Sequence, residues 1–372
     1  MTSGAFDIFL ATAPGLEATL RAEARSLGFD DAKAIPGGVT IHGRWPDVWR
    51  VNLSSRGAAR VLARIDSFRT VHLSQLDKRA RRVPWAKVLR ADVPFRVETT
   101  CKASRIYHSG AASERIERAI REELGAPASD TAEIVIKARI ERDICTVAVD
   151  TSGEPLHKRG FKEEVAKAPM RENLAAMFLR QCGYDGSEPV LDPMCGSGTF
   201  IIEAAEIAAG LLPGRARRFA FETLATFDPE AWQAMKQAAT ASPVSGGQHF
   251  HGSDRDAGAI RMSRANAERA GLAASTEFTH TPVEQLIAPP GPPGLVIVNP
   301  PYGDRIGDRK RLAALYRSLG HTLLTRFRGW RVGLVTSNAD LARATGLPFP
   351  APAAPVLHGG LRIMLFRSAA LP

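Results

Sequence analysis

The 372-residue chain is too long for one ordinary domain and long enough for two or three, each with its own core. Its content of 44% apolar and 24% charged residues is close to the globular average, which excludes a largely disordered or fibrous protein. The net charge of +10 favours a polyanionic partner, and residues 51–100 alone carry eleven Lys or Arg against four Asp or Glu.

Neither a membrane segment nor a metal site is indicated. The longest apolar stretch, Phe200–Leu212, contains Glu203 and Glu206 and is too short to span a bilayer. The N-terminus does not resemble a secretory signal. The four cysteines form no CxxC pair and no Cys/His group at ligand spacing, so no zinc site and no disulfide scaffold is expected. We expect a cytoplasmic protein.

Short extended runs and amphipathic helices alternate over the first 155 residues. This texture predicts a small α/β unit up to about residue 55, followed by an α+β domain that ends near Ser152-Gly153. Strands are expected at Ala5–Ala11, Val39–His42, Phe95–Thr99, Glu133–Ile140 and Ile144–Asp150, and helices at Gly15–Leu27 and Ser113–Leu124.

From about residue 156 strands alternate regularly with helices, apart from an insertion over 213–250. Such alternation predicts an α/β fold with a doubly wound, mostly parallel sheet. Strands are expected at Pro189–Leu191, His249–Ser253, Leu295–Val298 and Arg331–Thr336, and helices at 169–181, Thr199–Ala209, Ala257–Ala270 and Lys310–Phe327.

A glycine-rich turn joins the first of these strands to its helix. Its residues, Asp192–Thr199, read DPMCGSGT, and Gly196 and Gly198 let the backbone approach a ligand at a helix N-terminus. Many such turns only pack a helix on a sheet, and a nucleotide site would share the pattern. The missing lysine after the second glycine excludes a phosphate-binding GxxxxGK[ST] loop.

Asp254 ends the next strand, where an acid of a doubly wound fold faces the ligand crevice and can accept hydrogen bonds from ribose hydroxyls. It could instead cap the following helix. Asp256 is the better candidate for that cap, which leaves Asp254 freer for a ligand.

The sequence Asn299-Pro300-Pro301-Tyr302 directly follows the apolar strand Leu295–Val298. Its prolines make a rigid loop that holds the carbonyl of Pro300 outward as an acceptor. With the side-chain oxygen of Asn299 it could accept both hydrogens of an exocyclic amine, while Tyr302 stacks on the base. Taken alone, the sequence NPPY could be an ordinary turn. Because it follows a glycine loop and comes at the end of a later strand, it is a specific indication of such an amine-binding site.

With these motifs the chain resembles class I methyltransferases that modify amino groups. The wider context of Asp150–Phe161, Ala168–Ala176 and Leu191–Ala205, with the shorter stretch Ile106–Gly110, is similar to RNA guanine-N2 methyltransferases with a THUMP domain, above all to the N-terminal half of the bacterial 23S rRNA group. The resemblance implies a ferredoxin-like segment at 1–55, a THUMP RNA-binding domain at 56–155 and a Rossmann-like methyltransferase domain at 156–372.

The resemblance also implies S-adenosylmethionine as cofactor. Asp254 would hold its ribose, and Ala168–Asn173 would close over it. The other cofactor-binding residues would be Asp192, Met194, Cys195, Gly196, Gly198, Thr199 and Asn173. The chain departs from the family at Pro282, where an aspartate usually meets the adenine amine, so that contact must come from elsewhere.

The implied reaction is methyl transfer to N2 of a guanosine, catalysed by Asn299, Pro300 and Tyr302, with 23S rRNA preferred and tRNA as the alternative substrate. Adenine N6 in DNA and glutamine in a protein are rivals that share NPPY, and an RNA-binding module with an inactive methyltransferase domain is another. Eight basic residues are expected to help carry the RNA. They are Lys78, Arg79, Arg81, Arg82, Lys87, Arg90, Lys102 and Arg105.

Overall fold

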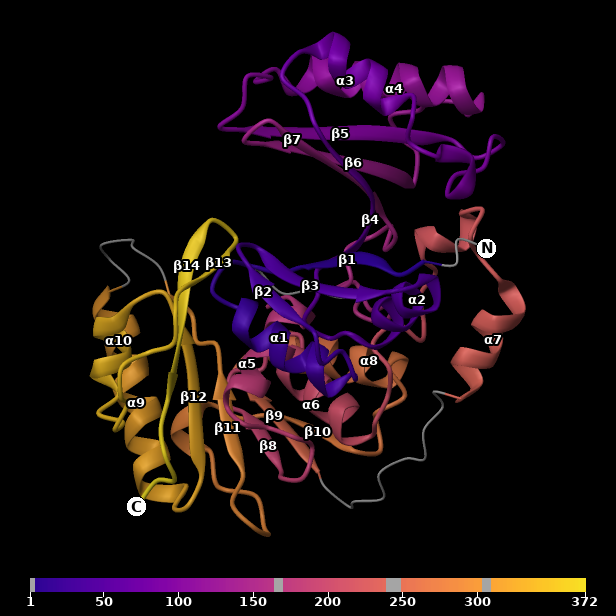
Figure 1. The fold of residues 1–372 in the computed structure, drawn as a ribbon. Coiled ribbons are helices and arrows are strands. Elements are labelled where there is room, and N and C mark those ends of the chain that lie inside the picture. The colour runs from indigo at the N-terminus through magenta and orange to yellow at the C-terminus, as the bar shows by residue number, and fades with distance from the viewer. Residues whose placement is uncertain (1–3, 164–169, 239–248, 303–308) are drawn as a thin grey trace. The chain divides into compact units, whose positions relative to one another are not determined.

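The computed structural model describes residues 4–163, 170–238, 249–302 and 309–372. These residues divide into two compact units, and each unit contains a seven-stranded sheet (Figure 1). Unit 1 takes its residues from Met1–Thr12, Leu20–Leu156 and Arg217–Ala239. Unit 2 takes its residues from Ala13–Thr19, His157–Ala216 and Thr240–Pro372.

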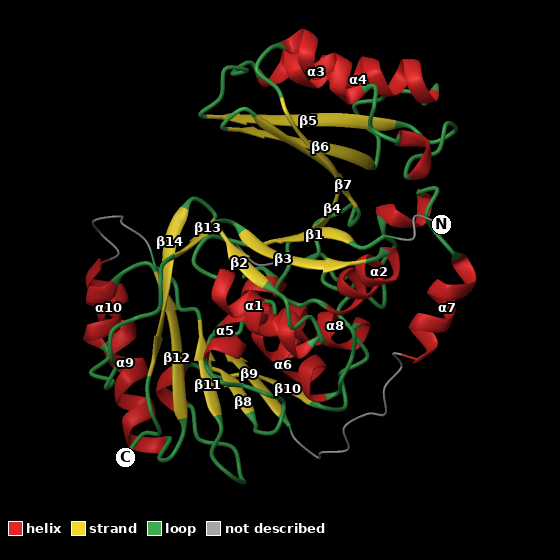
Figure 2. Ribbon diagram, viewed as in Figure 1, coloured by secondary structure: helices red, strands yellow, loops and turns green. Residues whose placement is uncertain are grey.

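The strands of unit 1 follow the order β2-β3-β1-β4-β7-β6-β5, and every pair is antiparallel except β5 with β6. Helices α3 and α4 cover one face of β5, β6 and β7 (Figure 2). The elements in chain order are β1 (Phe6–Ala11), α1 (Glu17–Ser26), β2 (Lys33–Ile35), β3 (Gly38–Gly43), α2 (Trp45–Ser54), β4 (Arg60–Arg69), α3 (Leu73–Ala80), η1 (Trp85–Lys87), β5 (Phe95–Lys102), α4 (Ser109–Leu124), β6 (Ile134–Glu141), β7 (Ile144–Asp150), η2 (Ala220–Thr223) and α7 (Pro229–Ala238).

Residues 217–238, which lie far along the sequence, pack within unit 1. The ring of Phe221 lies 6.1 Å from that of Trp49 and 5.1 Å from those of Phe219 and Trp232. Such aromatic contacts bury a large apolar area. The insertion expected inside the 156–372 domain therefore contributes part of its length to the other unit, while the boundaries expected at residues 55 and 155 stay predictions.

The strands of unit 2 follow the order β10-β9-β8-β11-β12-β14-β13, in which the first five are parallel and β14 is antiparallel to both of its neighbours, β12 and β13. This confirms the expected doubly wound, mostly parallel sheet. The elements are α5 (Glu172–Gln181), β8 (Val190–Asp192), α6 (Thr199–Ala208), β9 (Phe250–Asp254), α8 (Ala257–Arg269), β10 (Thr276–His280), η3 (Val283–Gln285), β11 (Leu295–Val298), α9 (Arg309–Arg326), β12 (Arg331–Thr336), α10 (Ala339–Ala344), β13 (Val356–His358) and β14 (Leu361–Arg367).

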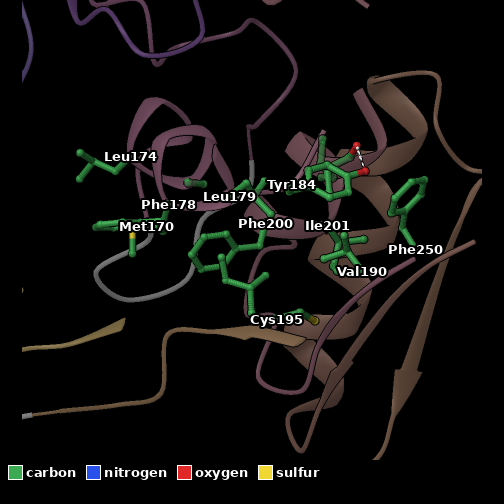
Figure 3. Close-up of a cluster of buried hydrophobic side chains, with 14 of the residues drawn as sticks. Met170, Leu174, Phe178, Leu179, Tyr184, Val190, Cys195, Phe200, Ile201 and Phe250 are labelled. Atoms are coloured by element: carbon green, nitrogen blue, oxygen red, sulfur yellow. Dashed lines mark hydrogen bonds between the residues drawn. The ribbon is translucent and has the colours of Figure 1, made fainter. Parts of the chain in front are cut away.

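Both faces of this sheet are buried. In β11, Leu295 and Ile297 join one apolar cluster with residues of α5, α6 and α8, whereas Val296 and Val298 join a second cluster with residues of α9 and α10. Figure 3 shows part of the first cluster, where the Tyr184 hydroxyl donates to the Ala204 carbonyl at 2.9 Å. Alternate side chains point to opposite faces of a strand, so a fully apolar strand must be covered on both.

The expected helices and strands are present, with ends that differ by one to a few residues. Several further elements were not expected from the sequence: β2, α2, β4, α3, α7, β10, α10, β13 and β14. The segment Ala168–Asn173 and the insertion 213–250 fall partly on residues 164–169 and 239–248, outside the described residues. No helix in the described part of the chain is long and apolar enough to cross a membrane.

Candidate active site

The strand order of unit 2 reverses between β8 and β11. From β8 the chain continues outward to β9 and β10, whereas β11 and β12 lie on the other side. In open α/β sheets, ligands bind at such a switch point, outside the carboxyl ends of the strands. Because Val296 pairs with Leu191, Asn299 lies two residues beyond the level of Asp192, which corresponds to a Cα separation of about 8 Å.

Side chains of α8 hold the glycine loop between β8 and α6 by hydrogen bonds to its backbone carbonyls. The Ser263 hydroxyl donates to the Gly196 carbonyl at 2.8 Å, and the Asn266 amide donates to the Ser197 carbonyl at 3.1 Å. Gly196 has φ +54° and no atom of the described residues within 4 Å of the place where a Cβ would lie, whereas a Cβ on Gly198, at φ +82°, would lie 3.1 Å from Ser263. Gly196 therefore leaves open space, and Gly198 permits close packing.

Asp254 reaches the same loop from the end of β9. Its carboxylate accepts from the Gly196 amide at 3.0 Å and from the Asp256 amide at 2.9 Å. The side chain of Asp256 in turn caps α8 by accepting from Gly258 at 2.8 Å, which confirms the expected cap. Asp254 is only half-buried, so its carboxylate remains accessible at the carboxyl edge of the sheet.

Asp192 is the buried acid of the site. Its carboxylate accepts from the Met194 amide at 3.0 Å and is 2% exposed. Burial raises the pKa of Asp192 to about 8, and the neighbouring charge of Asp254 acts in the same direction. Two carboxyl groups so arranged favour a cation beside them, because a positive charge would restore the ionised form of Asp192.

Three further predicted cofactor residues belong to the loop itself. Cys195 is buried with its Sγ 3.7 Å from the Ser263 hydroxyl, and burial raises the pKa of its thiol well above the usual range. Met194 is half-buried against the second apolar cluster, and Thr199 is buried at the first position of α6. The Cys195 side chain thus belongs to the core, so only its backbone is placed to line the loop.

A buried lysine joins the glycine loop to α5, and sequence reasoning did not single it out. Lys162 Nζ donates to Thr199 Oγ1 and to the Met170 carbonyl, both at 2.9 Å, and lies 3.2 Å from Glu172 Oε1. The side chains of Lys162 and Glu172 are 9% and 10% exposed. Burial raises the pKa of Glu172, while Lys162 opposes that shift. Only the position of Lys162 directly after Arg159-Gly-Phe161 could have drawn attention to it.

Asn299 and Asn173 each carry a buried side-chain oxygen without a hydrogen-bond partner among the described residues. Asn299 directly follows β11, and Asn173 lies in the first turn of α5. Pro300 is buried, and Tyr302 is half-buried between the two apolar clusters, which raises the pKa of its hydroxyl. An unpaired buried acceptor is costly unless a ligand satisfies it, so both asparagines are candidates for contact with bound groups.

Pro282 lies just past the carboxyl end of β10, where its neighbour Thr281 donates its amide to the Asp254 carbonyl at 3.1 Å. The position therefore borders the same edge of the sheet as Asp254. Proline offers neither a carboxylate nor an amide hydrogen to an adenine there.

The predicted RNA-binding residues lie in unit 1 and differ in how they are paired. Arg81 is tied to Asp77, Glu122 and Glu123, and Arg90 to Asp92. Lys102 and Arg105 have looser acidic partners at 3.5 and 3.8 Å. The remaining four are exposed and form no ion pair among the described residues. These are Lys78, Arg79, Arg82 and Lys87.

No group of three or more His, Cys, Asp or Glu side chains that could hold a metal ion occurs in the described part of the chain.

Comparison with known proteins identifies three consecutive domains. A "RlmL ferredoxin-like domain" matches residues 7–62, a "THUMP domain" residues 72–150 and an "RMKL-like, methyltransferase domain" residues 159–350. The ribosomal RNA large subunit methyltransferase K/L of Syntrophotalea carbinolica is 36% identical over 358 residues, which cover 91% of this chain and 50% of that protein. The chain spans about half the length of the curated relatives it matches.

Two solved structures are similar over almost the whole chain. SMU.472, which was crystallised as a complex with SAH, has a TM-score of 0.90 at 26% identity and covers all of both chains. A protein of Listeria monocytogenes, described as a predicted N6-adenine-specific DNA methylase, has a TM-score of 0.88 at 28% identity over 99% of this chain and 97% of that one. Since the methyltransferase match spans just over half of its length and the two smaller domains precede it, the chain belongs to the RMKL-like methyltransferase family.

Proposed function

We propose that the protein is an S-adenosylmethionine-dependent methyltransferase that methylates N2 of a guanosine in RNA, with 23S rRNA as the substrate. The unpaired, buried side-chain oxygen of Asn299 carries this proposal, because it lies at the switch point of the sheet, beside the glycine loop. A carbonyl oxygen that no described residue satisfies is placed to accept a hydrogen from a bound donor, and an exocyclic amine is such a donor.

The residues at this edge fit S-adenosylmethionine. The open space at Gly196 admits the amino-acid end, and the raised pKa of Asp192 fits a site that receives an ammonium group. The accessible carboxylate of Asp254 can accept from ribose hydroxyls. The similarity to SMU.472, which was crystallised with SAH, supports the same choice. We further propose that Asn173, Met194, Cys195, Gly198 and Thr199 complete the pocket.

The mechanism that we infer relies on positioning. Bound S-adenosylmethionine supplies an electrophilic methyl group on a sulfonium. Asn299 and the carbonyl of Pro300 accept hydrogen bonds from the two hydrogens of the guanine amine, which aims its lone pair at that methyl group. Tyr302 holds the flipped base by stacking. The amine gives up one proton to solvent when it is methylated. Placement of the amine in line with the methyl group by a preorganised set of acceptors accounts for most of the rate, so no strong general base is needed.

Several observations favour RNA over DNA as the substrate. The chain carries a THUMP domain, the curated relatives are named for ribosomal RNA, and unit 1 presents unpaired cations. The name of the Listeria protein points instead to adenine in DNA. The side-chain oxygen of Asn299 could accept a hydrogen bond from the N6 amine of adenine just as well as from the N2 amine of guanine. Asn299 therefore selects an amine and not a particular base, and the choice of guanine and of 23S rRNA over tRNA rests on the family resemblance.

The proposal is tested by mass spectrometry of nucleosides from rRNA and tRNA of a strain that lacks the gene. We expect loss of N2-methylguanosine from 23S rRNA. Loss of N2-methylguanosine from tRNA alone would favour tRNA as the substrate. Loss of N6-methyladenine would show that the methylated base is adenine and not guanine.

A further inference from the structure

Unit 1 contains a groove on the face of its sheet that α3 and α4 leave uncovered (Figure 2). Its volume is about 740 Å³, and side chains from β1, β4, β5, β6 and β7 line it. The alternation along β6 explains the charge of this face, because Ile136 and Ile140 are buried whereas Lys137 and Arg139 line the groove.

Five cations and two acids line this groove, which leaves a net charge of +3. Both acids form ion pairs with cations of the groove. Glu98 pairs with Lys137, and Glu141 pairs with Arg139 at 2.7 Å and with Lys102 at 3.5 Å. The other two cations are Arg64, which pairs with Asp7 at 3.6 Å and lies over the Phe9 ring at 5.0 Å, and Arg142, which is exposed. Such exposed ion pairs are weak, so these cations can take up a phosphate.

The end of the groove is built from strained backbone. Ala103, Arg142 and Asp143 have φ of +46°, +49° and +63°, and they are the only residues other than glycine with positive φ in the part of the chain that the structure describes. Residues 142 and 143 form the turn between β6 and β7, where Asn-Gly or Asp-Gly is the usual choice.

Hydrogen bonds hold this strained end in place. The Asp143 amide donates to the Ser104 hydroxyl at 3.0 Å, and the Arg105 amide donates to the Asp143 carboxylate at 2.9 Å. Strain of this kind persists only where the surroundings enforce it, and it concentrates at functional positions. The turn thereby places Arg142 at this end of the groove, where the Arg142 amide donates to the Lys102 carbonyl at 3.3 Å.

We propose that this groove binds the sugar-phosphate backbone of a short unpaired RNA segment, with Arg139 and Arg142 contacting phosphates. Ile144, which is 42% exposed, offers an apolar surface for a base. A groove of this size suits a ligand of one or two nucleotides and not a double helix. The inference rests on the proposed function and deepens it by giving the RNA a further contact in unit 1. It differs from the predicted basic set, with which the groove shares only Lys102.

The test measures binding of a fluorescent twelve-nucleotide oligouridylate to the full chain by anisotropy at several salt concentrations. Each phosphate contact with a single strand contributes a slope of about 0.7 in log affinity against log salt. The double variant Arg139→Gln/Arg142→Gln loses two such contacts, so its slope should be lower by about 1.4. With equal affinities at 1 M salt, this difference in slope corresponds to binding that is about 14-fold weaker than that of the parent at 0.15 M salt. Glu141 keeps Lys102 as its partner in this variant.

The matched control removes two exposed arginines of α1 that do not line the groove, in Arg21→Gln/Arg25→Gln. This control should bind as the parent does, and Arg139→Lys/Arg142→Lys should retain most of the slope. An equal loss in both glutamine variants, an unchanged slope in the groove variant, or tighter binding of a duplex than of the single strand would overturn the proposal. Displacement of the oligouridylate by polyglutamate at equal charge concentration would assign the groove to an acidic peptide instead.

The outcome is separable from that of the proposed function. If the protein transfers methyl groups to RNA but the groove variant binds the oligonucleotide normally, only the groove assignment fails. If the parent binds the oligonucleotide through the groove but methylates no RNA, only the proposed function fails.

Discussion

The raised pKa of Asp192 predicts that cofactor binding releases a proton. With a pKa of about 8, Asp192 is protonated in about nine molecules of ten at pH 7 when no ligand is present. The ammonium group of S-adenosylhomocysteine, placed beside this carboxyl by the proposed binding mode, favours the ionised form. If it lowers the pKa below about 6, binding releases about 0.8 to 0.9 proton at pH 7.

Isothermal titration calorimetry at pH 7 in buffers with different ionisation enthalpies measures this release. The observed enthalpy should change with the ionisation enthalpy of the buffer with a slope near −0.9, where a positive slope counts uptake by the protein. Because binding releases a proton, the affinity for S-adenosylhomocysteine should rise with pH up to about 8. Above that pH the affinity should be level, because Asp192 is then already ionised before the ligand binds.

Asp192→Asn supplies the control, since its amide oxygen can still accept from the Met194 amide while its side chain no longer titrates. This variant should bind more weakly and release no proton from this position. A slope of zero in the parent, proton uptake, or the same release in Asp192→Asn would refute the assignment of Asp192 to the ammonium end of the cofactor.

Further substitutions test the remaining parts of the site and the predicted RNA contacts. Asp254→Ala should weaken S-adenosylhomocysteine binding by roughly 1.5–3 kcal/mol, because the ribose hydroxyls lose a charged acceptor; unchanged affinity in calorimetry would contradict the ribose contact. Asn299→Ala should bind the cofactor normally but lose most single-turnover methyl transfer, and a normal rate would remove Asn299 from the mechanism. Lys162→Met should lower the free energy of unfolding of unit 2 by about 3–5 kcal/mol, because Glu172 keeps a buried charge without its partner. Adding Glu172→Gln should recover much of that loss in urea unfolding, whereas additive losses would mean that the two side chains are not coupled. Replacing four exposed cations together should flatten the salt dependence of RNA affinity, and an unchanged slope would exclude them. These are Lys78, Arg79, Arg82 and Lys87.

Local patterns in the sequence were sufficient for much of unit 2. The apolar run Leu295–Val298 predicted the strand β11, and the structure divides its four residues between two clusters, as in a strand covered on both faces. The cap at Asp256 followed from its place before α8. The order of motifs along the chain also predicted that Asp192, Asp254 and Asn299 would follow strands of one parallel sheet, because the carboxyl ends of parallel strands meet at one edge.

Contacts between residues far apart in sequence could not be predicted in this way. Arg81 looked like a free cation, but Glu122 and Glu123 of α4 neutralise it from about forty residues away. The ammonium of Lys162 meets Thr199 only because α5 and α6 pack together. No periodicity encodes such partners, since they depend on the order of the strands and on which helix covers which face.

The most direct test of the central claim is methyl transfer by the purified protein to 23S rRNA transcribed in vitro, with digestion to nucleosides and mass spectrometry. Transfer RNA transcripts and double-stranded DNA serve as competing substrates, and Asn299→Ala serves as the inactive control. We expect N2-methylguanosine in 23S rRNA with the parent protein and almost none with Asn299→Ala. N6-methyladenine in DNA, or product formed equally by the parent and by Asn299→Ala, would contradict the account.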